Sequence, residues 1–274
     1  MKKTIAILGS TGSIGKNTYN IIKNNKNDFN VILLSTNKNI NTIYKQAKEL
    51  KAKIKIKLNS NNKHYLKNVL RLSEGKVVNI FNGIDGEWET EIDINIDHLT
   101  CKKQIRKQTK EYGPKLYFSL IKKHNIRWMI EKVTELGVEQ ITPIVTDRTN
   151  NKSFNEKKVL SHIIEASEVS ERLTLPRLHK KSTLLNILKQ TQQNSDILFF
   201  CNENRKDDYL QNNLTKINKR KISFLIGPEG GFSDKEEKLI KSFSHVKSIK
   251  LFDRILRAET AAVLAISIIN SYTE

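Results

Sequence analysis

The sequence predicts an α/β protein built mainly on parallel strands. Short apolar runs typical of buried strands alternate with segments of helical spacing along most of the 274 residues, and this alternation favours a parallel sheet covered by helices. Several apolar runs end in glycine turns, the kind of strand end at which α/β proteins bind ligands. The length allows one large domain or two smaller ones with real cores.

The first 57 residues predict a strand–helix–strand–helix–strand unit. In chain order we expect a strand at 4–8, a helix at 15–23, a strand at 30–35, a helix at 40–50 and a half-exposed strand in KAKIKIKLN, where lysine alternates with apolar residues. Gly9, Gly12 and Gly15 stand between the first strand and helix, where a glycine turn lets a helix N-terminus bind phosphate.

This opening resembles the N-terminus of 1-deoxy-D-xylulose 5-phosphate reductoisomerase, in GSTGSIG and again in LLSTNKN, over roughly residues 1–50. At the end of the second strand, where dinucleotide-binding proteins usually carry an acid, this chain has Ser35, Thr36, Asn37 and Lys38. These residues are better suited to a 2′-phosphate. A dinucleotide site needs a second mononucleotide half, and the sequence downstream does not continue that way. We therefore interpret residues 1–57 as an isolated Rossmann-like βαβ fragment. An NADPH-binding oxidoreductase is the less favoured interpretation.

Residues 58–110 predict a small β-rich module. HYLKNVLRL and VVNIFNGIDGEWETEIDINI are interpreted as short strands broken by Asn-Gly and Asp-Gly turns. Residues 102–123 carry eight basic side chains against one acid, and the chain has a net charge of +19, which is typical of a protein with a polyanionic partner such as RNA. A composition biased toward lysine and asparagine explains much of the excess equally well, and a basic stretch can also be a solvated linker.

Beyond residue 110 the strand–helix alternation is regular. The expected strands are KLYFSLI, QITPIVT, DILFFCN, ISFLIG and SIKLF, and the expected helices are IRWMIEKVTEL ending at Gly137, Glu156 to about Arg172, and Ala258 to about Tyr272. The last helix is apolar on most sides, so we expect it to be buried by its own domain or by a partner.

Two stretches near the C-terminus carry the candidate chemistry. In FLIGPEGGFSDKEE a glycine-rich turn joins a buried strand to a helix that Ser233 caps. In LFDRILRAETAA a strand end continues through a basic loop into the last helix. With this spacing, GPEGG and ILRAETA resemble the bacterial 16S ribosomal RNA uridine-N3 methyltransferases, a family within the trefoil-knotted α/β, or SPOUT, methyltransferases.

The resemblance covers about residues 58–274. HYLKNVLRL with FNG is similar to the family's N-terminal PUA-like β-barrel, and IEKVTELGVEQITPIVTDR and EASEVSERLTLP are similar to its first methyltransferase motifs. It implies an RNA-binding PUA-like barrel at 58–110 and a trefoil-knotted SPOUT domain at 111–274, after the fragment at 1–57. It also implies S-adenosylmethionine (SAM) as cofactor, a homodimer with the site at its interface, and methylation of N3 of one uridine in the 16S ribosomal RNA of the small subunit.

The resemblance assigns roles by position. The implied cofactor-binding residues are Phe200, Leu225, Ile226, Gly227, Pro228, Glu229, Gly230, Gly231, Phe252, Ile255, Leu256, Arg257 and Thr260. The expected RNA contacts are His64, Asn68, Arg71, Lys102, Lys103, Arg106, Lys107, Arg148 and Arg172. Arg257 and Glu259 are the candidate catalytic residues. Arg257 would stabilise oxyanion charge or hold the RNA, and Glu259 or Glu229 would accept the uridine proton. The alternative is that Arg257 and Glu259 only pair with each other and shape the loop.

Three positions depart from the family pattern: Phe252 replaces a glycine, Val169 replaces a glutamine, and KAKIKIKLN or the reductoisomerase-like stretch replaces the first barrel strand. A non-catalytic RNA-binding remnant of the family is therefore the alternative function. Cys101 and Cys201 lie far apart without metal-ligand spacing, and no apolar run reaches eighteen residues. We accordingly expect a cytoplasmic protein with neither a metal nor a membrane contact.

Overall fold

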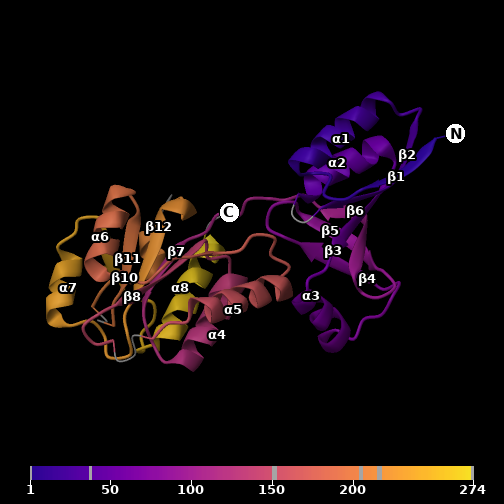
Figure 1. The fold of residues 1–274 in the computed structure, drawn as a ribbon. Helices are drawn as coiled ribbons and strands as arrows, with labels where there is room; N and C mark the ends of the chain where they lie inside the picture. Colours follow the sequence, from indigo (N-terminus) through magenta and orange to yellow (C-terminus); the bar gives the residue numbers. More distant parts are fainter. Residues whose placement is uncertain (1, 37–38, 150–152, 204–205, 215–217, 273–274) are drawn as a thin grey trace. The chain divides into compact units, whose positions relative to one another are not determined.

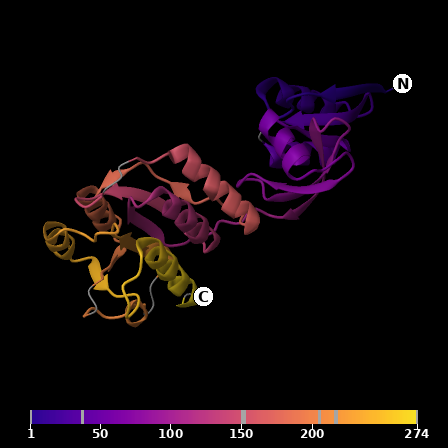
Figure 2. The ribbon, with the colours of Figure 1, turned by 90° about the horizontal axis from the view of Figure 1, so that it is seen from below.

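The computed structural model describes residues 2–36, 39–149, 153–203, 206–214 and 218–272. The chain divides into two compact units, Met1–Thr109 (unit 1) and Lys110–Glu274 (unit 2), each with its own sheet (Figures 1 and 2). This division lies one residue from the boundary predicted after residue 110. Among the described residues, no helix has both the length and the apolar character needed to cross a membrane.

Unit 1 is built on one mixed sheet of six strands. Its elements are β1 (Lys3–Ile7), α1 (Ser13–Asn24), β2 (Phe29–Thr36), α2 (Ile40–Leu50), β3 (Lys53–Lys57), α3 (Ser60–His64), a π-helical segment (Tyr65–Val69), β4 (Val77–Phe81), β5 (Glu87–Ile92) and β6 (His98–Arg106). The strand order is β1-β2-β3-β6-β5-β4. β1, β2 and β3 are parallel, whereas β6, β5 and β4 continue the sheet in antiparallel fashion.

The prediction of an isolated fragment over residues 1–57 is wrong, because this segment shares its sheet with the β-rich residues that follow. The lysine-alternating stretch forms β3, which pairs with β2 on one edge and with β6 on the other. Tyr44 of α2 packs edge-on against Trp88 of β5, with ring centroids 4.6 Å apart. The backbone N–H of Asn41 donates to the Asp85 carboxylate at 3.1 Å. A boundary at residue 57 would separate β3 from β6, Tyr44 from Trp88 and Asn41 from Asp85.

The segment HYLKNVLRL is helical, which corrects the prediction of a strand. Asn59 caps α3 by accepting a hydrogen bond from the backbone N–H of Asn62, and the helical path continues through the π-helical segment. Leu66 is the side chain buried from this segment, and it packs in a small cluster with Ile92 and Leu99. The apolar residues of this short segment therefore mark one face of a helix and not one face of a strand.

Unit 2 is built on a parallel sheet covered by helices. Its elements are β7 (Lys115–Ser119), α4 (Lys123–Glu135), β8 (Gln140–Val145), α5 (Glu156–Val169), β9 (Arg177–Leu178), β10 (Ser182–Thr183), α6 (Leu184–Gln193), β11 (Ile197–Cys201), two 3₁₀ segments (Leu210–Asn213 and Lys219–Lys221), β12 (Ile222–Ile226), α7 (Asp234–Lys241), β13 (Val246–Ile249) and α8 (Ala258–Tyr272). The strand order is β10-β8-β7-β12-β11-β13, with β9 beside β8, and every pairing is parallel.

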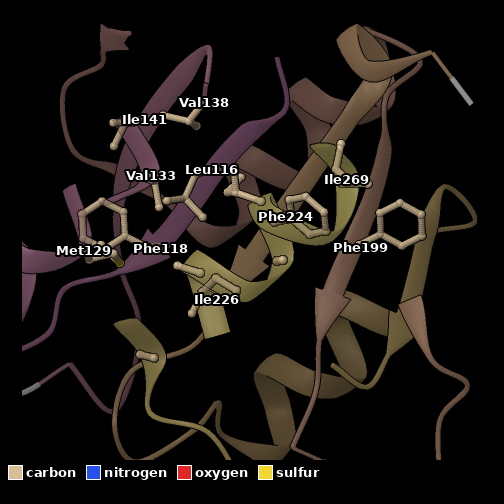
Figure 3. Close-up of a cluster of buried hydrophobic side chains, with 14 of the residues drawn as sticks. Leu116, Phe118, Met129, Val133, Val138, Ile141, Phe199, Phe224, Ile226 and Ile269 are labelled. Carbon is tan, nitrogen blue, oxygen red and sulfur yellow. The ribbon is translucent and has the colours of Figure 1, made fainter. Parts of the chain in front are cut away.

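The main core of unit 2 lies on the face of the sheet covered by α4, α5 and α8, and Figure 3 shows buried side chains of this cluster. Phe224 of β12 stands in register with Leu116 of β7 and stacks on Phe199 of β11, with centroids 5.8 Å apart. Met129 from α4 and Ile269 from α8 are fully buried in the same cluster. The apolar last helix is therefore buried largely by its own unit, which is one of the two arrangements that its sequence predicts.

Candidate functional site

A cavity of about 250 Å³ lies where three neighbouring strands of unit 2 end. β11 lies between β12 and β13, so the segments that follow these strands meet at the carboxyl edge of the sheet. Their lining residues, together with three from α7 and α8, are Phe200, Cys201, Asn202, Glu203, Ile226, Gly227, Pro228, Glu229, Gly231, Phe232, Glu237, Leu251, Phe252, Arg254, Ile255, Leu256, Arg257, Ala258 and Ala261. Ligands of parallel α/β proteins bind in this position.

The loop after β12 is shaped by close packing around glycine. A Cβ on Gly227 would come within 2.9 Å of the Phe232 ring, and Gly231 has a φ of +68°, which favours glycine. Phe232 is buried and packs edge-on against Phe200, with centroids 5.4 Å apart. Ser233 then starts α7 with a capping box to Glu236. The loop therefore brings main-chain groups and one aromatic wall into the cavity.

The loop after β13 gives the cavity an exposed apolar and basic rim. Phe252 is 42% exposed and Ile255 is 63% exposed, although both line the cavity. The guanidinium of Arg254 lies over the Phe252 ring, 4.6 Å from its centroid. An exposed aromatic face beside guanidinium groups is suited to a planar, anionic ligand such as a nucleotide.

Carboxylates occupy other parts of the cavity wall. Glu203, Glu229 and Glu237 come from three different segments, and one oxygen of Glu229 accepts a hydrogen bond from the backbone N–H of Lys122 at 3.2 Å. The site thus has acceptors for hydroxyl or amino groups in addition to the basic rim. Burial raises the pKa of the Cys201 thiol, so this cysteine is neutral in the wall.

The two predicted catalytic residues occupy different environments. Arg257 is exposed and lines the cavity. Glu259 is only 7% exposed, is not among the lining residues, and has one carboxylate oxygen with no hydrogen-bond partner among the described residues. No ion pair joins Arg257 to Glu259 in the part of the chain that the structure describes. An ion pair between Arg257 and Glu259, the alternative to a catalytic role in the sequence analysis, therefore does not shape the loop.

Most predicted cofactor residues meet in this cavity. Those that do not line it are Leu225, which is fully buried in the sheet, Gly230 and Thr260. The carbonyl of Gly230 instead accepts a hydrogen bond from Arg148 at 2.9 Å. The residues that the sequence did not identify include Glu237 and Arg254; Phe232 was also missed, although it directly follows the glycine turn within the recognised motif.

The prediction that Arg172 contacts RNA is wrong. The residue is 6% exposed, and its guanidinium donates to the carbonyls of Thr134 and Val138 at 2.8 Å each. It also forms an ion pair with Glu111 at 3.0 Å. Burial lowers the pKa of Arg172, yet these partners hold the charge inside unit 2. Arg172 therefore serves the packing of this unit.

The other predicted RNA-binding residues differ in whether an acidic side chain pairs with them. Lys102, Lys103 and Arg106 lie on β6 and each forms an ion pair with an acid of β5. Lys115, part of the basic stretch at 102–123, pairs with the buried Asp196 at 2.6 Å. The remaining predicted residues are on the surface: His64, Asn68, Arg71, Lys107 and Arg148. The positive surface is thus smaller than the sequence predicts.

The glycine turn of unit 1 contacts the end of β2. The backbone N–H of Gly9 donates to the hydroxyl of Ser35 at 3.1 Å, and the hydroxyls of Thr11 and Thr36 are 2.8 Å apart. Asn37 and Lys38, the other two residues expected near a 2′-phosphate, lie outside the described residues.

A parallel sheet whose strand ends enclose a cavity with glycine and basic loops defines an α/β protein that binds a nucleotide-like ligand. Residues 110–270 match the family model described as RNA methyltransferase domain. Ribosomal RNA small subunit methyltransferase E of Rickettsia conorii is 36% identical over 211 residues, 74% of this chain and 84% of the relative. Its namesake in Buchnera aphidicola subsp. Schizaphis graminum is 32% identical over 77% of this chain and 88% of the relative. The chain belongs to the ribosomal RNA small subunit methyltransferase E family.

Solved structures show the same fold. A Legionella pneumophila protein in complex with SAM aligns with a TM-score of 0.68 and 25% identity, covering 79% of this chain and 91% of that one. Ribosomal RNA small subunit methyltransferase E from Neisseria gonorrhoeae, bound to SAM, aligns with a TM-score of 0.67 and 22% identity over 80% of this chain and 92% of its own.

The N-terminal resemblance is also confirmed and extends further than residue 50. Residues 5–99 match the family model of 1-deoxy-D-xylulose 5-phosphate reductoisomerase. The enzyme of Porphyromonas gingivalis is 44% identical over 70 residues, which are 26% of this chain and 18% of that protein. The chain thus spans less than a fifth of the reductoisomerase.

Proposed function

We propose that this chain is a SAM-dependent methyltransferase that methylates N3 of a specific uridine in the 16S ribosomal RNA of the small subunit. The observation that carries the proposal is the cavity in which the GPEGG loop, the ILRAETA loop and the end of β11 meet. The names of the relatives and the SAM bound to two structural neighbours agree with it.

The residues of the cavity fit SAM chemically. The adenine ring can pack on apolar wall residues such as Phe200, Phe232 and Leu256, and glycine at position 227 lets main-chain groups approach closely. The carboxylates of Glu203 and Glu237 can accept hydrogen bonds from ribose hydroxyls or from an amino group. When bound, SAM supplies a methyl group activated by a positively charged sulfur.

The chain's own contribution is to orient the nucleotide and manage its proton. Uridine N3 carries a proton that must leave, and negative charge spreads to the flanking carbonyl oxygens. Arg257, exposed on the wall, can stabilise that charge through a planar pair of donors. Glu229 lines the cavity and Glu259 does not, so we favour Glu229 as the proton acceptor and Glu259 as a residue that supports the start of α8.

The finer architecture of the family belongs to this proposal. We infer a trefoil knot around the loops that follow β12 and β13, a PUA-like role for the antiparallel half of unit 1, and a homodimer with the cavity at its interface. We also expect the protein to act in the cytoplasm, where bacterial small subunits assemble. Light scattering at micromolar concentration tests the dimer, and a monomer with full activity would contradict the shared site.

A second candidate, an RNA-binding relative without turnover, is favoured by one observation: the Phe252 side chain occupies part of the cavity wall. Titration with SAM and with NADPH, followed by incubation with unmethylated small subunits and SAM, separates the alternatives. SAM binding with methyl transfer to a single uridine, located by mass mapping of the RNA, supports the proposal. SAM binding without transfer supports the second candidate, and NADPH binding without SAM binding supports the reductase interpretation.

A further inference from the structure

A histidine and two glutamates from neighbouring helices of unit 2 meet at a position that does not line the cavity. Glu131 lies on α4, His162 and Glu165 lie on α5, and α4 packs against α5. Residues three apart share one face of a helix, so His162 and Glu165 both face Glu131. One nitrogen and two carboxylate oxygens from these side chains lie within 4.8 Å of one another.

His162 has an unsatisfied nitrogen that points into this group. The residue is 7% exposed, and its Nδ1 atom has no hydrogen-bond partner among the described residues. The nearest carboxylate oxygen of Glu131 is 3.9 Å from Nδ1, which is too long for a hydrogen bond. Two ligands of one tetrahedral ion with bonds of about 2.1 Å would be about 3.4 Å apart. The observed separation is therefore close to that of two ligands on a shared ion.

Arg127 holds the Glu131 carboxylate in place. Its Nε donates to Glu131 at 2.6 Å, and this bond, with the charges of Glu131 and then Glu165, raises the pKa of Arg127. Carboxylates that bind metals are commonly oriented by a hydrogen bond of this kind; here the oxygen that accepts it, Oε1 of Glu131, is also the one that lies 3.9 Å from His162 Nδ1. Glu168 lies one turn beyond Glu165, and burial, followed by the charge of Glu165, raises its pKa. This group thus contains three carboxylates, those of Glu131, Glu165 and Glu168, and the single guanidinium of Arg127.

We propose that Glu131, His162 and Glu165 form a binding site for a divalent transition-metal ion of the Zn²⁺ type. One imidazole nitrogen and two carboxylate oxygens are a donor set that such ions accept, with the remaining position taken by water. Mg²⁺ and Ca²⁺ prefer oxygen ligands alone, so they bind this site far more weakly. Bound metal joins α4 to α5, and it stabilises unit 2 because it binds the folded chain in preference to the unfolded one.

The test uses the full chain freed of metal with a chelator. Titration with Zn²⁺ by calorimetry, and with Co²⁺ by visible absorption, is expected to show one equivalent bound with a spectrum of nitrogen and oxygen ligands. Glu165→Gln and His162→Gln are expected to weaken this binding more than tenfold, because losing even an outer partner of a metal site costs about 10–100-fold. Glu135→Gln is the matched control, since Glu135 is on α4 but pairs with Lys132.

His162 is buried, so circular dichroism and thermal unfolding must accompany its replacement. Glu165 is exposed, and Glu165→Gln decides the question if His162→Gln does not fold. The proposal is overturned if the metal-free chain takes up no Zn²⁺, if Glu165→Gln binds it as tightly as Glu135→Gln does, or if Mg²⁺ binds equally well.

Discussion

Replacing Gly227 with alanine tests how tightly the loop after β12 packs against Phe232 in the cavity wall. The added Cβ would lie 2.9 Å from Cε2 and 3.1 Å from Cδ2 of Phe232, closer than carbon atoms normally approach. The ring cannot simply swing away, because Phe232 is 5% exposed and is held edge-on by Phe200. One extra methyl group in such a packed place costs about 1–3 kcal/mol.

We expect that cost to appear at the cavity, because Phe232 forms its wall. If the ring moves to relieve the contact, the surface offered to SAM changes, and SAM affinity falls by about tenfold, which corresponds to about 1.4 kcal/mol. Calorimetric titration with SAM measures the loss of affinity, and thermal unfolding measures the loss of stability. The double variant Gly227→Ala with Phe232→Leu should bind SAM better than Gly227→Ala alone, since it removes the atoms that clash.

Gly230→Ala is the matched control in the same turn. A Cβ there would have its nearest neighbours, atoms of the Arg148 side chain, at 3.8 Å, which is ordinary contact. It should therefore bind SAM like the parent protein. Equal SAM affinity in Gly227→Ala and Gly230→Ala would refute the reasoning about the Phe232 wall.

Three further outcomes are expected. Arg257→Ala should keep the fold and most SAM affinity but lower methyl transfer to intact small subunits about 100-fold or more, the effect of losing one charge-stabilising donor; unchanged turnover at saturating SAM would remove its catalytic role. Arg172→Ala should destabilise unit 2 by about 1–3 kcal/mol in urea unfolding, because the carbonyls of Thr134 and Val138 lose a buried donor; weaker RNA binding without a loss of stability would contradict this. Deletion of residues 1–50 should make the rest of unit 1 sensitive to protease, since it removes Leu34 and Ile43 from the core, while SAM affinity in unit 2 stays unchanged; a large loss of SAM affinity would contradict the separation of the two units.

The elements of unit 2 were predictable because their apolar periodicity is strong. The last helix begins at Ala258 and ends at Tyr272 as expected, and the glycine after α4 has a φ of +85°, as a helix end requires. The glycine turn and the Ser233 cap of FLIGPEGGFSDKEE were predictable because turn chemistry is local, whereas the cofactor role of both motifs came from the family resemblance. Their meeting in one cavity follows from the strand order of unit 2, in which β11 lies between β12 and β13, and this order was not predicted from the sequence.

Two of the errors, the boundary at residue 57 and the role of Arg172, concern contacts between distant residues, whereas the prediction of a strand for HYLKNVLRL was a local error of secondary structure. Nothing local in KAKIKIKLN shows that β3 has partners on both edges, and so the sequence suggested a boundary where the sheet is continuous. Arg172 looks like any basic surface residue until the carbonyls of Thr134 and Val138 are seen around it. Ion pairs across β5 and β6 likewise join residues that are far apart in sequence but adjacent in the sheet, so charge counting overestimated the free positive surface.

The central position of β12 in the second sheet has a consequence for how the chain folds during synthesis. β7 pairs with β12 from Lys115↔Ser223 onward, so a strand made early waits for one made more than a hundred residues later. Unit 1 has all of its strands by residue 106 and can fold while the rest is still being translated. Until β12 emerges, one edge of β7 is an open, apolar template for pairing with other chains. We therefore expect chains cut short before residue 222 to aggregate through β7, and nascent chains to depend on chaperones during that interval.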